Sequence, residues 1–290
     1  MSINFSRMNR FVALVALYLF LIQFVLAQKP VASLPTARQI ASKADEYMNT
    51  AVKIDGFSGA VLVARDGQSV FSKAYRMANF ELDAPNTPQS IFRIGSITKQ
   101  FTAMAIMMLQ ERGKLSVNDP ICKHLADCPP AWQPITIRHL LTNTSGIVNY
   151  INLPDYGKVW MLPTSPENFI KFFKDKPLEF VPGEKFAYSN SGYYLLGVII
   201  KRESGKDYDD FLEENIFTPL GMKNTGYDSV RRFIKNRADG YVMEGDRIFN
   251  SGCPNMSTVF AAGALYSTTE DLLLWVQVSL HGKTHCAQIA

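Results

Sequence analysis

The sequence has little excess charge, few histidines, and no internal repeat or low-complexity segment. Its 30 Lys and Arg residues against 26 Asp and Glu residues leave a formal net charge of +4. That charge is too small and too evenly spread for a nucleic-acid partner or a polybasic membrane patch. The four histidines are scattered, and the pair His281 and His285 has no carboxylate motif beside it. We therefore expect neither a metal site nor a cofactor.

The N-terminus has the pattern of a secretory signal. The first ten residues carry Arg7 and Arg10 but no acidic residue, and residues 11–26 are apolar except for Gln23. Small residues at the −3 and −1 positions predict cleavage after Ala27 and a periplasmic or secreted protein. An uncleaved membrane anchor is the alternative, because the apolar run is close to the shortest spanning helix. Cleavage would lower the net charge to +2.

Cysteine is also scarce. No cysteine stands directly after the apolar run, where a lipoprotein would carry its lipid-modified cysteine, so a lipoprotein is not expected. Cys122 and Cys128 have five residues between them, and in an exported protein this spacing predicts a small disulfide loop. Cys253 and Cys286 either pair with each other or stay free.

The rest of the chain is predicted to form one domain. Residues 28–35 are a short linker, and residues 36–290 are enough for one sizeable core. Thr36 is a helix N-cap residue, and the apolar spacing after it predicts a helix to about Lys53.

Strand and helix patterns then indicate the fold class. The apolar runs 58–65 and 68–75 flank Asp66-Gly67, which predicts a tight antiparallel hairpin. Residues from 114 to about 230 form predicted helices separated by proline-rich loops. An antiparallel sheet beside a mainly helical region predicts an α+β architecture with a cleft between its layers.

A serine and a lysine stand at the start of one predicted helix. The run from Lys99 to Arg112 reads as a helix that stops at Gly113, with Ser96 in its first turn. Lys99 is three residues after Ser96 and shares its face. A serine hydroxyl becomes a good nucleophile only when a base takes its proton, and a lysine does so only when it is neutral. By itself this pair is also what an ordinary capped helix with a solvated lysine would contain.

A second motif follows 92 residues later. Tyr188-Ser189-Asn190 precedes an apolar helix that begins near Ser191. A phenol beside a serine–lysine pair can relay protons, and a carboxamide can hold a substrate amide through its donor and its acceptor. The bland alternative is a half-buried tyrosine and an asparagine cap at a helix start.

Together these motifs resemble the serine β-lactamase and penicillin-binding protein superfamily, and its class C branch with DD-peptidases and esterases in particular. The resemblance covers about residues 40 to 280 and rests on several segments in the family's order. These are 92–99 around the nucleophile, 135–147, the Tyr-x-Asn motif at 188–190, 217–222 and 262–272.

The resemblance implies an acyl-enzyme mechanism on a β-lactam, a D-amino-acid peptide or a small ester. Ser96 would be the acylated nucleophile, Lys99 its base partner, Tyr188 a general acid/base and Asn190 a substrate contact. Which of Lys99 and Tyr188 takes the serine proton stays open, because a coupled pair shares its titration. The implied fold is the β-lactamase/DD-peptidase fold.

One part of the family pattern is missing. The family has a third motif, a basic residue or His, then Thr or Ser, then Gly, on a strand that also supplies the second oxyanion-hole N–H. After residue 265 we predict only a helix from Thr269 to about Leu280, opened by the capping box 267–270. Lys283-Thr284-His285 matches two positions of the motif but has His in place of Gly.

We therefore expect a C-terminally truncated domain without its closing strands, with poor solubility and weak activity. The rival hypothesis is a non-catalytic family member that binds peptidoglycan or another ligand. The missing motif favours that rival, whereas intact Ser96, Lys99, Tyr188 and Asn190 favour the enzyme.

Overall fold

The computed structural model describes residues 34–280. The described residues divide into two units between Ile40 and Ala41. The predicted signal, Cys286 and the segment 283–285 lie outside the described residues. Within the described range, no helix combines the length and the apolar character that crossing a membrane requires.

The first elements follow the local sequence signals. Helix α2 (Ala37–Ile54) begins after Thr36, whose hydroxyl accepts a hydrogen bond from the Gln39 N–H at 3.3 Å, which confirms the predicted cap. Strands β1 (Gly59–Arg65) and β2 (Gln68–Tyr75) then pair in antiparallel register. Asp66 and Gly67 join them with φ angles of 51° and 75°, as a two-residue hairpin turn requires.

The remaining strands are short and antiparallel. One sheet has the order β5-β9-β6, and two further sheets pair β3 with β4 and β7 with β8. The strand bounds are β3 Met77–Asn79, β4 Ala84–Pro85, β5 Phe92–Arg93, β6 Gly226–Tyr227, β7 Tyr241–Glu244, β8 Arg247–Asn250 and β9 Leu265–Ser267. The β5–β9 pairing matters most, because it brings the segment before Ser96 beside the segment around residue 265.

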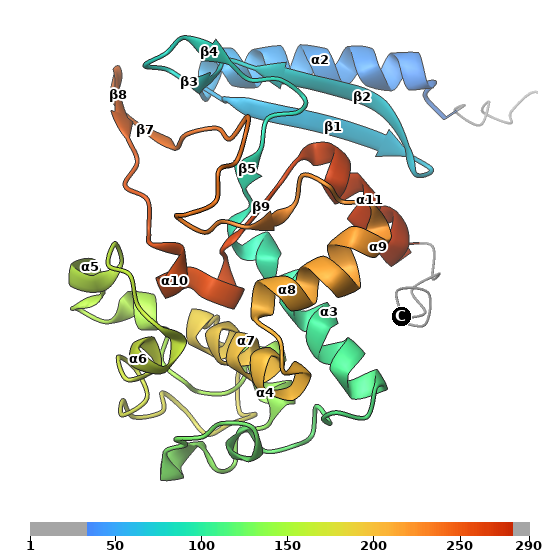
Figure 1. Cartoon of the computed structure of the whole chain (residues 1–290). Coiled ribbons are helices and arrows are strands. Elements are labelled where there is room, and N and C mark those ends of the chain that lie inside the picture. The colour runs from blue at the N-terminus through green and yellow to red at the C-terminus, as the bar shows by residue number, and fades with distance from the viewer. Residues whose placement is uncertain (1–33, 281–290) are drawn as a thin grey trace, which may run out of the picture. The chain divides into compact units, whose positions relative to one another are not determined.

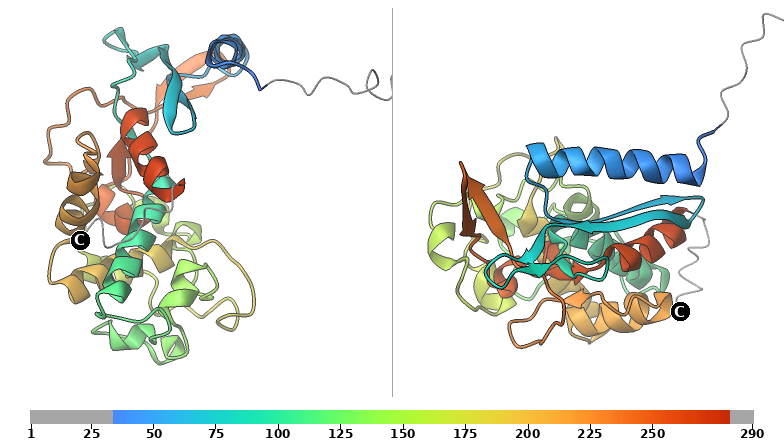
Figure 2. Two further views of the ribbon diagram at one scale, coloured as in Figure 1. Left: turned by 90° about the vertical axis from the view of Figure 1, so that its right-hand side faces the viewer. Right: turned by 90° about the horizontal axis from the view of Figure 1, so that it is seen from above.

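Two helices form the centre of the hydrophobic core. Helices α3 (Thr98–Glu111) and α7 (Asn190–Ser204) pack against each other, and they lie side by side in Figures 1 and 2. Both helices contribute side chains with no exposed surface to this core, such as Phe101 and Leu195. Burying each such side chain contributes about 1.5–3 kcal/mol, which fixes the two helices relative to each other. Helix α3 ends before Gly113 as predicted, α7 ends at Gly205, and both glycines have positive φ.

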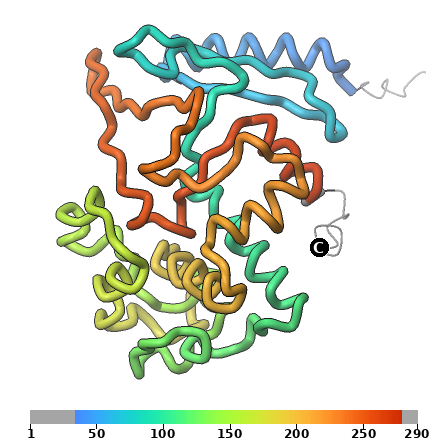
Figure 3. Tube along the Cα trace, viewed as in Figure 1, coloured from blue at the N-terminus to red at the C-terminus, as the bar shows by residue number. Residues whose placement is uncertain are grey.

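Short helices and turns complete the described chain. Their bounds are α4 Ile137–Leu141, α5 Tyr156–Val159, α6 Pro166–Ile170, α8 Tyr208–Leu212, α9 Thr218–Leu220, α10 Met256–Val259 and α11 Thr269–Leu280. Helix α11 contacts β1, and the trace in Figure 3 shows the red segment before it running past the start of α3. This mixture of helices and antiparallel sheets confirms the predicted α+β class.

The cap of α11 differs from the prediction by one residue. Thr268, not Ser267, caps the helix, since its hydroxyl accepts from the Asp271 N–H at 3.2 Å. Ser267 instead shares a hydrogen bond with the hydroxyl of Thr225 at 2.8 Å. The Asp271 carboxylate accepts from Thr225 as well, so the buried polar contact between these elements decides which hydroxyl becomes the cap.

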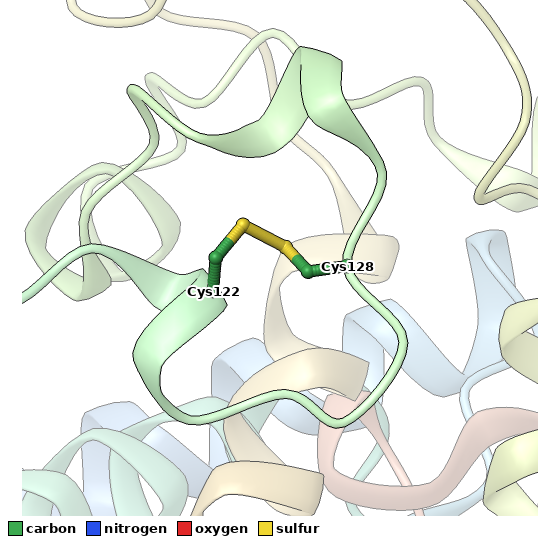
Figure 4. The surroundings of a disulfide bond; sticks show 2 residues. All are labelled: Cys122 and Cys128. Atoms are coloured by element: carbon green, nitrogen blue, oxygen red, sulfur yellow. A yellow bond between two sulfur atoms is a disulfide. The ribbon is translucent and has the colours of Figure 1, made fainter.

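The predicted disulfide is present. Cys122 and Cys128 are bonded, and the bond closes the loop that follows a 3-10 turn at Ile121–Lys123 (Figure 4). Within residues 34–280, Cys253 is a free, half-buried thiol.

Candidate active site

Ser96 lies in a tight turn that leads directly into α3. The turn is a 3-10 helix from Gly95 to Ile97, and Gly95 has a φ of 51°, a conformation that favours glycine. Ser96 therefore sits just before α3 and not in its first α-helical turn as predicted. Its side chain is exposed, whereas Lys99, one turn later, is only 7% exposed.

The Tyr-x-Asn segment meets this turn at the start of α7. The Tyr188 hydroxyl is 2.6 Å from Ser96 Oγ, and Tyr188 is 43% exposed. Lys99 Nζ is 3.2 Å from Ser96 Oγ and 2.7 Å from Asn190 Oδ1. The structure thus brings all four predicted site residues into one hydrogen-bonded cluster.

Lys99 has two further kinds of neighbour. Its Nζ donates to the Ala262 carbonyl at 2.6 Å, and it lies 4.9 Å and 5.4 Å from the ring centres of Tyr188 and Tyr193. Removal from water lowers the pKa of Lys99, because burial penalises the charged amine, and the contact with Tyr188 opposes part of this effect. The lysine is therefore closer to its neutral form than an exposed lysine is.

The arrangement around Lys99 fits a neutral amine. The Asn190 and Ala262 oxygens are acceptors only, and together they use both N–H groups of a neutral lysine. The remaining lone pair is then free to accept the proton of the Ser96 hydroxyl. A protonated lysine would instead donate to all three oxygens.

The Ala262 carbonyl is a site group that sequence reasoning missed. It belongs to a 3-10 turn at Phe260–Ala262, whose first residue has φ 45° and ψ −134°. This conformation is unusual for a residue with a side chain. The neighbouring Ala261 carbonyl accepts from Thr102 Oγ1 at 2.8 Å, so this turn is tied to α3 at two points.

Asn143 and Asn149 were also missed as site residues. Both lie in the loop after α4 and hydrogen-bond to the segment that carries Tyr188 and Asn190. Asn143 falls within the family-like segment 135–147, but the sequence does not assign it a role, and Asn149 looks like an ordinary loop asparagine. Their partners are distant in the sequence, so only the folded chain identifies them.

His, Cys, Asp and Glu side chains, the usual metal ligands, occur throughout residues 34–280. No group of three or more His, Cys, Asp or Glu side chains in that range is arranged to hold a metal ion. His281, His285 and the partial third motif at 283–285 lie outside the described residues. The described site thus consists of a hydroxyl, an amine, a phenol and a carboxamide.

Sequence comparison decides the family. The model of the beta-lactamase family matches residues 44–288. The chain belongs to the beta-lactamase family. This beta-lactamase family member is 35% identical over 191 residues to Penicillin-binding protein 4* of Bacillus subtilis (strain 168), across 64% of this chain and 41% of that protein. It is 26% identical over 230 residues to teichoic acid D-alanine hydrolase of Staphylococcus aureus, across 79% of this chain and 55% of that protein.

Known structures agree with this assignment. The D-amino acid amidase from Ochrobactrum anthropi SV3, solved in complex with L-phenylalanine amide, is similar to this chain with a TM-score of 0.69 and 28% identity. The similarity covers 84% of this chain and 69% of the amidase. Beta-lactamase family relatives thus include hydrolases, and the expected fold is confirmed. The chain spans 41% to 63% of the length of the first curated relatives that it matches.

Proposed function

We propose that this protein is a serine hydrolase that acts through an acyl-enzyme at Ser96. The proposal rests on two contacts of Ser96 Oγ, which lies 2.6 Å from the Tyr188 hydroxyl and 3.2 Å from Lys99 Nζ. An exposed hydroxyl between a phenol and an amine whose pKa is lowered by burial has what nucleophilic catalysis needs. Membership of a family that includes hydrolases supports the same conclusion.

In the first step Lys99 takes the hydroxyl proton while Ser96 Oγ attacks the substrate carbonyl carbon. Lys99 is assigned as the base because its two N–H groups are committed to Asn190 and Ala262, which leaves the lone pair toward Ser96. Tyr188, at the mouth of the site, then protonates the leaving group and takes up from Lys99 the proton that Ser96 released. The N–H groups at the start of the turn before α3 stabilise the negative charge on the carbonyl oxygen.

The substrate class that we propose is a D-amino-acid amide or ester, or a β-lactam. The chain is similar to proteins named for D-alanine ester and D-amino acid amide hydrolysis. Asn190 would hold a substrate amide through its carboxamide. We further propose that the domain spans residues 36–290 and acts after export, and the Cys122–Cys128 disulfide fits an oxidising compartment.

The test is covalent labelling of the full-length chain. We expect a fluorescent penicillin or a fluorophosphonate to add to Ser96, as mapped by mass spectrometry of the labelled peptide. Ser96→Ala should abolish labelling. Ser189→Ala is the matched control. The Ser189 hydroxyl is buried and has no hydrogen-bond partner among residues 34–280, so labelling should not depend on it. Label that persists in Ser96→Ala would refute the proposal.

Export is tested separately. The mature protein isolated from the periplasm or the medium should begin at Gln28. A protein that stays in the cytoplasm with residues 1–27 attached would contradict the proposed location.

A further inference from the structure

The loop after α4 holds the backbone of the Tyr-x-Asn segment. The Asn143 carbonyl accepts from the Ala187 N–H at 2.9 Å, and Asn143 Oδ1 accepts from the Ser189 N–H at 3.1 Å. These two bonds lie on either side of Tyr188. Asn143 has a φ of 55°, a left-handed conformation that asparagine tolerates better than most residues. The backbone that carries the phenol is therefore fixed from this loop.

The same loop holds the start of α7. The Ser191 hydroxyl donates to the Val148 carbonyl at 2.7 Å and accepts from the Tyr150 N–H at 3.0 Å. Ser191 is fully buried, so these bonds are shielded from water. The loop and the first turn of α7 therefore form one rigid unit beside the site.

Asn149 makes the contact that matters for the chemistry. It is 6% exposed, and its Oδ1 accepts from both the backbone N–H and the side-chain Nδ2 of Asn190, at 3.2 Å and 3.3 Å. An amide group has its donor and its acceptor on opposite sides. With Nδ2 turned to Asn149, the Asn190 oxygen must face Lys99, where it lies 2.7 Å from Nζ.

We propose that Asn149 is a positioning residue that keeps the Asn190 carboxamide oxygen toward Lys99, so that the lysine lone pair stays available to Ser96. The inference rests on the proposed function and adds a residue to it. A protonated lysine holds the amide oxygen by itself, because it has only N–H groups to offer. A neutral lysine has no such preference, since it accepts a hydrogen bond as readily as it donates one. In the neutral state, Asn149 is what prevents the amide from turning.

The turned amide would block the base. Its NH2 group would donate to the lone pair of Lys99, and that lone pair would then be lost to Ser96. This state is open only to the neutral lysine, so access to it lowers the pKa of Lys99. Among the described residues, the titratable groups in contact with Lys99 are Tyr188 on the segment before α7 and Tyr193 on α7. The 260–262 turn contributes a carbonyl and no titratable group.

The direction of the pKa change separates positioning from a general structural role. With Asn149→Leu we expect the pKa of Lys99 to fall by about 0.3 pH unit, because a second, equally favourable orientation of the amide doubles the statistical weight of the neutral lysine. If the substitution merely loosened the loop, water would reach the amine and the pKa would rise toward that of an exposed lysine. The two explanations therefore predict opposite signs.

The measurement is a pH titration of the full chain labelled with 13Cε-lysine, followed by NMR, with the Lys99 signal assigned from Lys99→Met. Asn152→Leu is the matched control: Asn152 is exposed, lies three residues later in the same loop, and should leave the titration unchanged. Asn149→Asp keeps the acceptor and adds a negative charge, so it should raise the pKa of Lys99. An unchanged or raised pKa in Asn149→Leu would overturn the proposal.

Two further readouts keep the test decisive. If Asn149→Leu does not melt cooperatively, Asn149→Asp takes its place as the test. An unchanged pKa of Lys99 in Asn149→Asp would refute the coupling between residue 149 and Lys99. Because the titration needs no turnover, it tests positioning even where Ser96 is not acylated. Where acylation is measured, Asn149→Leu should lower its alkaline plateau by about twofold, because half of the neutral lysine then has its lone pair blocked, whereas Asn149→Asp should keep it. Absence of labelling in the unmodified chain would instead count against the proposed function.

Discussion

Gly197 is the position where one added methyl group should disturb both the core and the site. It lies in α7, and a Cβ there would meet Phe260 Cε1 at 2.4 Å and Ala261 Cβ at 2.5 Å. Ordinary van der Waals contact begins at 3.4 Å. In Gly197→Ala, α7 or the 260–262 turn must therefore move by about 1 Å.

The expected cost is moderate, because two effects oppose each other. Overpacking of a tight core costs about 1–3 kcal/mol. Alanine in place of glycine inside a helix returns about 1 kcal/mol. We expect a net loss of up to about 2 kcal/mol and a melting temperature lower by up to about 8 °C for a domain of this size. The movement also carries the Ala262 carbonyl away from Lys99, whose Nζ it contacts at 2.6 Å, so acylation should slow as well.

The assay is thermal and urea denaturation together with the rate of acylation by a labelled penicillin. Gly157→Ala is the matched control: Gly157 also lies within a helix, and a Cβ there would have no neighbour within 4 Å. It should be neutral or slightly stabilising. If Gly197→Ala melts and reacts like the unmodified protein, then the tight contact between α7 and the 260–262 turn does not hold the site.

Three further outcomes are expected. Lys99→Met and Tyr188→Phe should each slow acylation about 10²-fold or more without changing the far-UV circular dichroism, and equal rates in all three proteins would contradict these roles. In the unmodified protein, acylation should speed up as the pH rises, and burial of Lys99 should place the midpoint of that rise below 10.5, the ordinary lysine value. Replacing both Cys122 and Cys128 by serine should lower the free energy of unfolding by about 2 kcal/mol in urea titrations, because a short loop is no longer closed in the unfolded chain. Hydrogen bonds from the Ser116 N–H, Lys123 and His124 lower the pKa of Asp119 from 3.8 to about 2. The contribution of Asp119 to the free energy of unfolding is therefore complete above about pH 4 and is lost as the pH falls toward 2. Asp119→Asn should flatten this part of the curve of stability against pH.

Features set by neighbouring residues were predictable from the sequence. The Asp66-Gly67 hairpin, the end of α3 at Gly113 and the Cys122–Cys128 loop depend on a few adjacent positions, and all three are present. The cap of α11 shows the limit of this reasoning. Several hydroxyl residues in a row fit the same pattern, and the buried contact with Thr225 selects Thr268 as the cap.

Contacts between distant segments could not be derived in this way. Ser96 and Tyr188 are 92 residues apart, and their proximity was expected only from a resemblance to known motifs. Ala262 lies in the family-like segment 262–272, but a backbone oxygen has no pattern that reveals its role, and Asn149 looks like any asparagine in a loop. Their importance follows from where the loop and the β5–β9 pairing place them.

The unusual backbone at Phe260 follows from the same placement. A residue with a side chain at φ 45° and ψ −134° costs about 1–3 kcal/mol, so the surrounding structure must hold it there. Its ring lies 5.2 Å and 5.1 Å from the rings of Tyr194 and Tyr208, and it already occupies the space beside Gly197 that a Cβ would need. The strained residue begins the turn whose carbonyls reach Lys99 and Thr102. A relaxed backbone at this point would turn the Ala262 oxygen away from the amine, and Lys99 would lose one of the two acceptors that direct its lone pair toward Ser96.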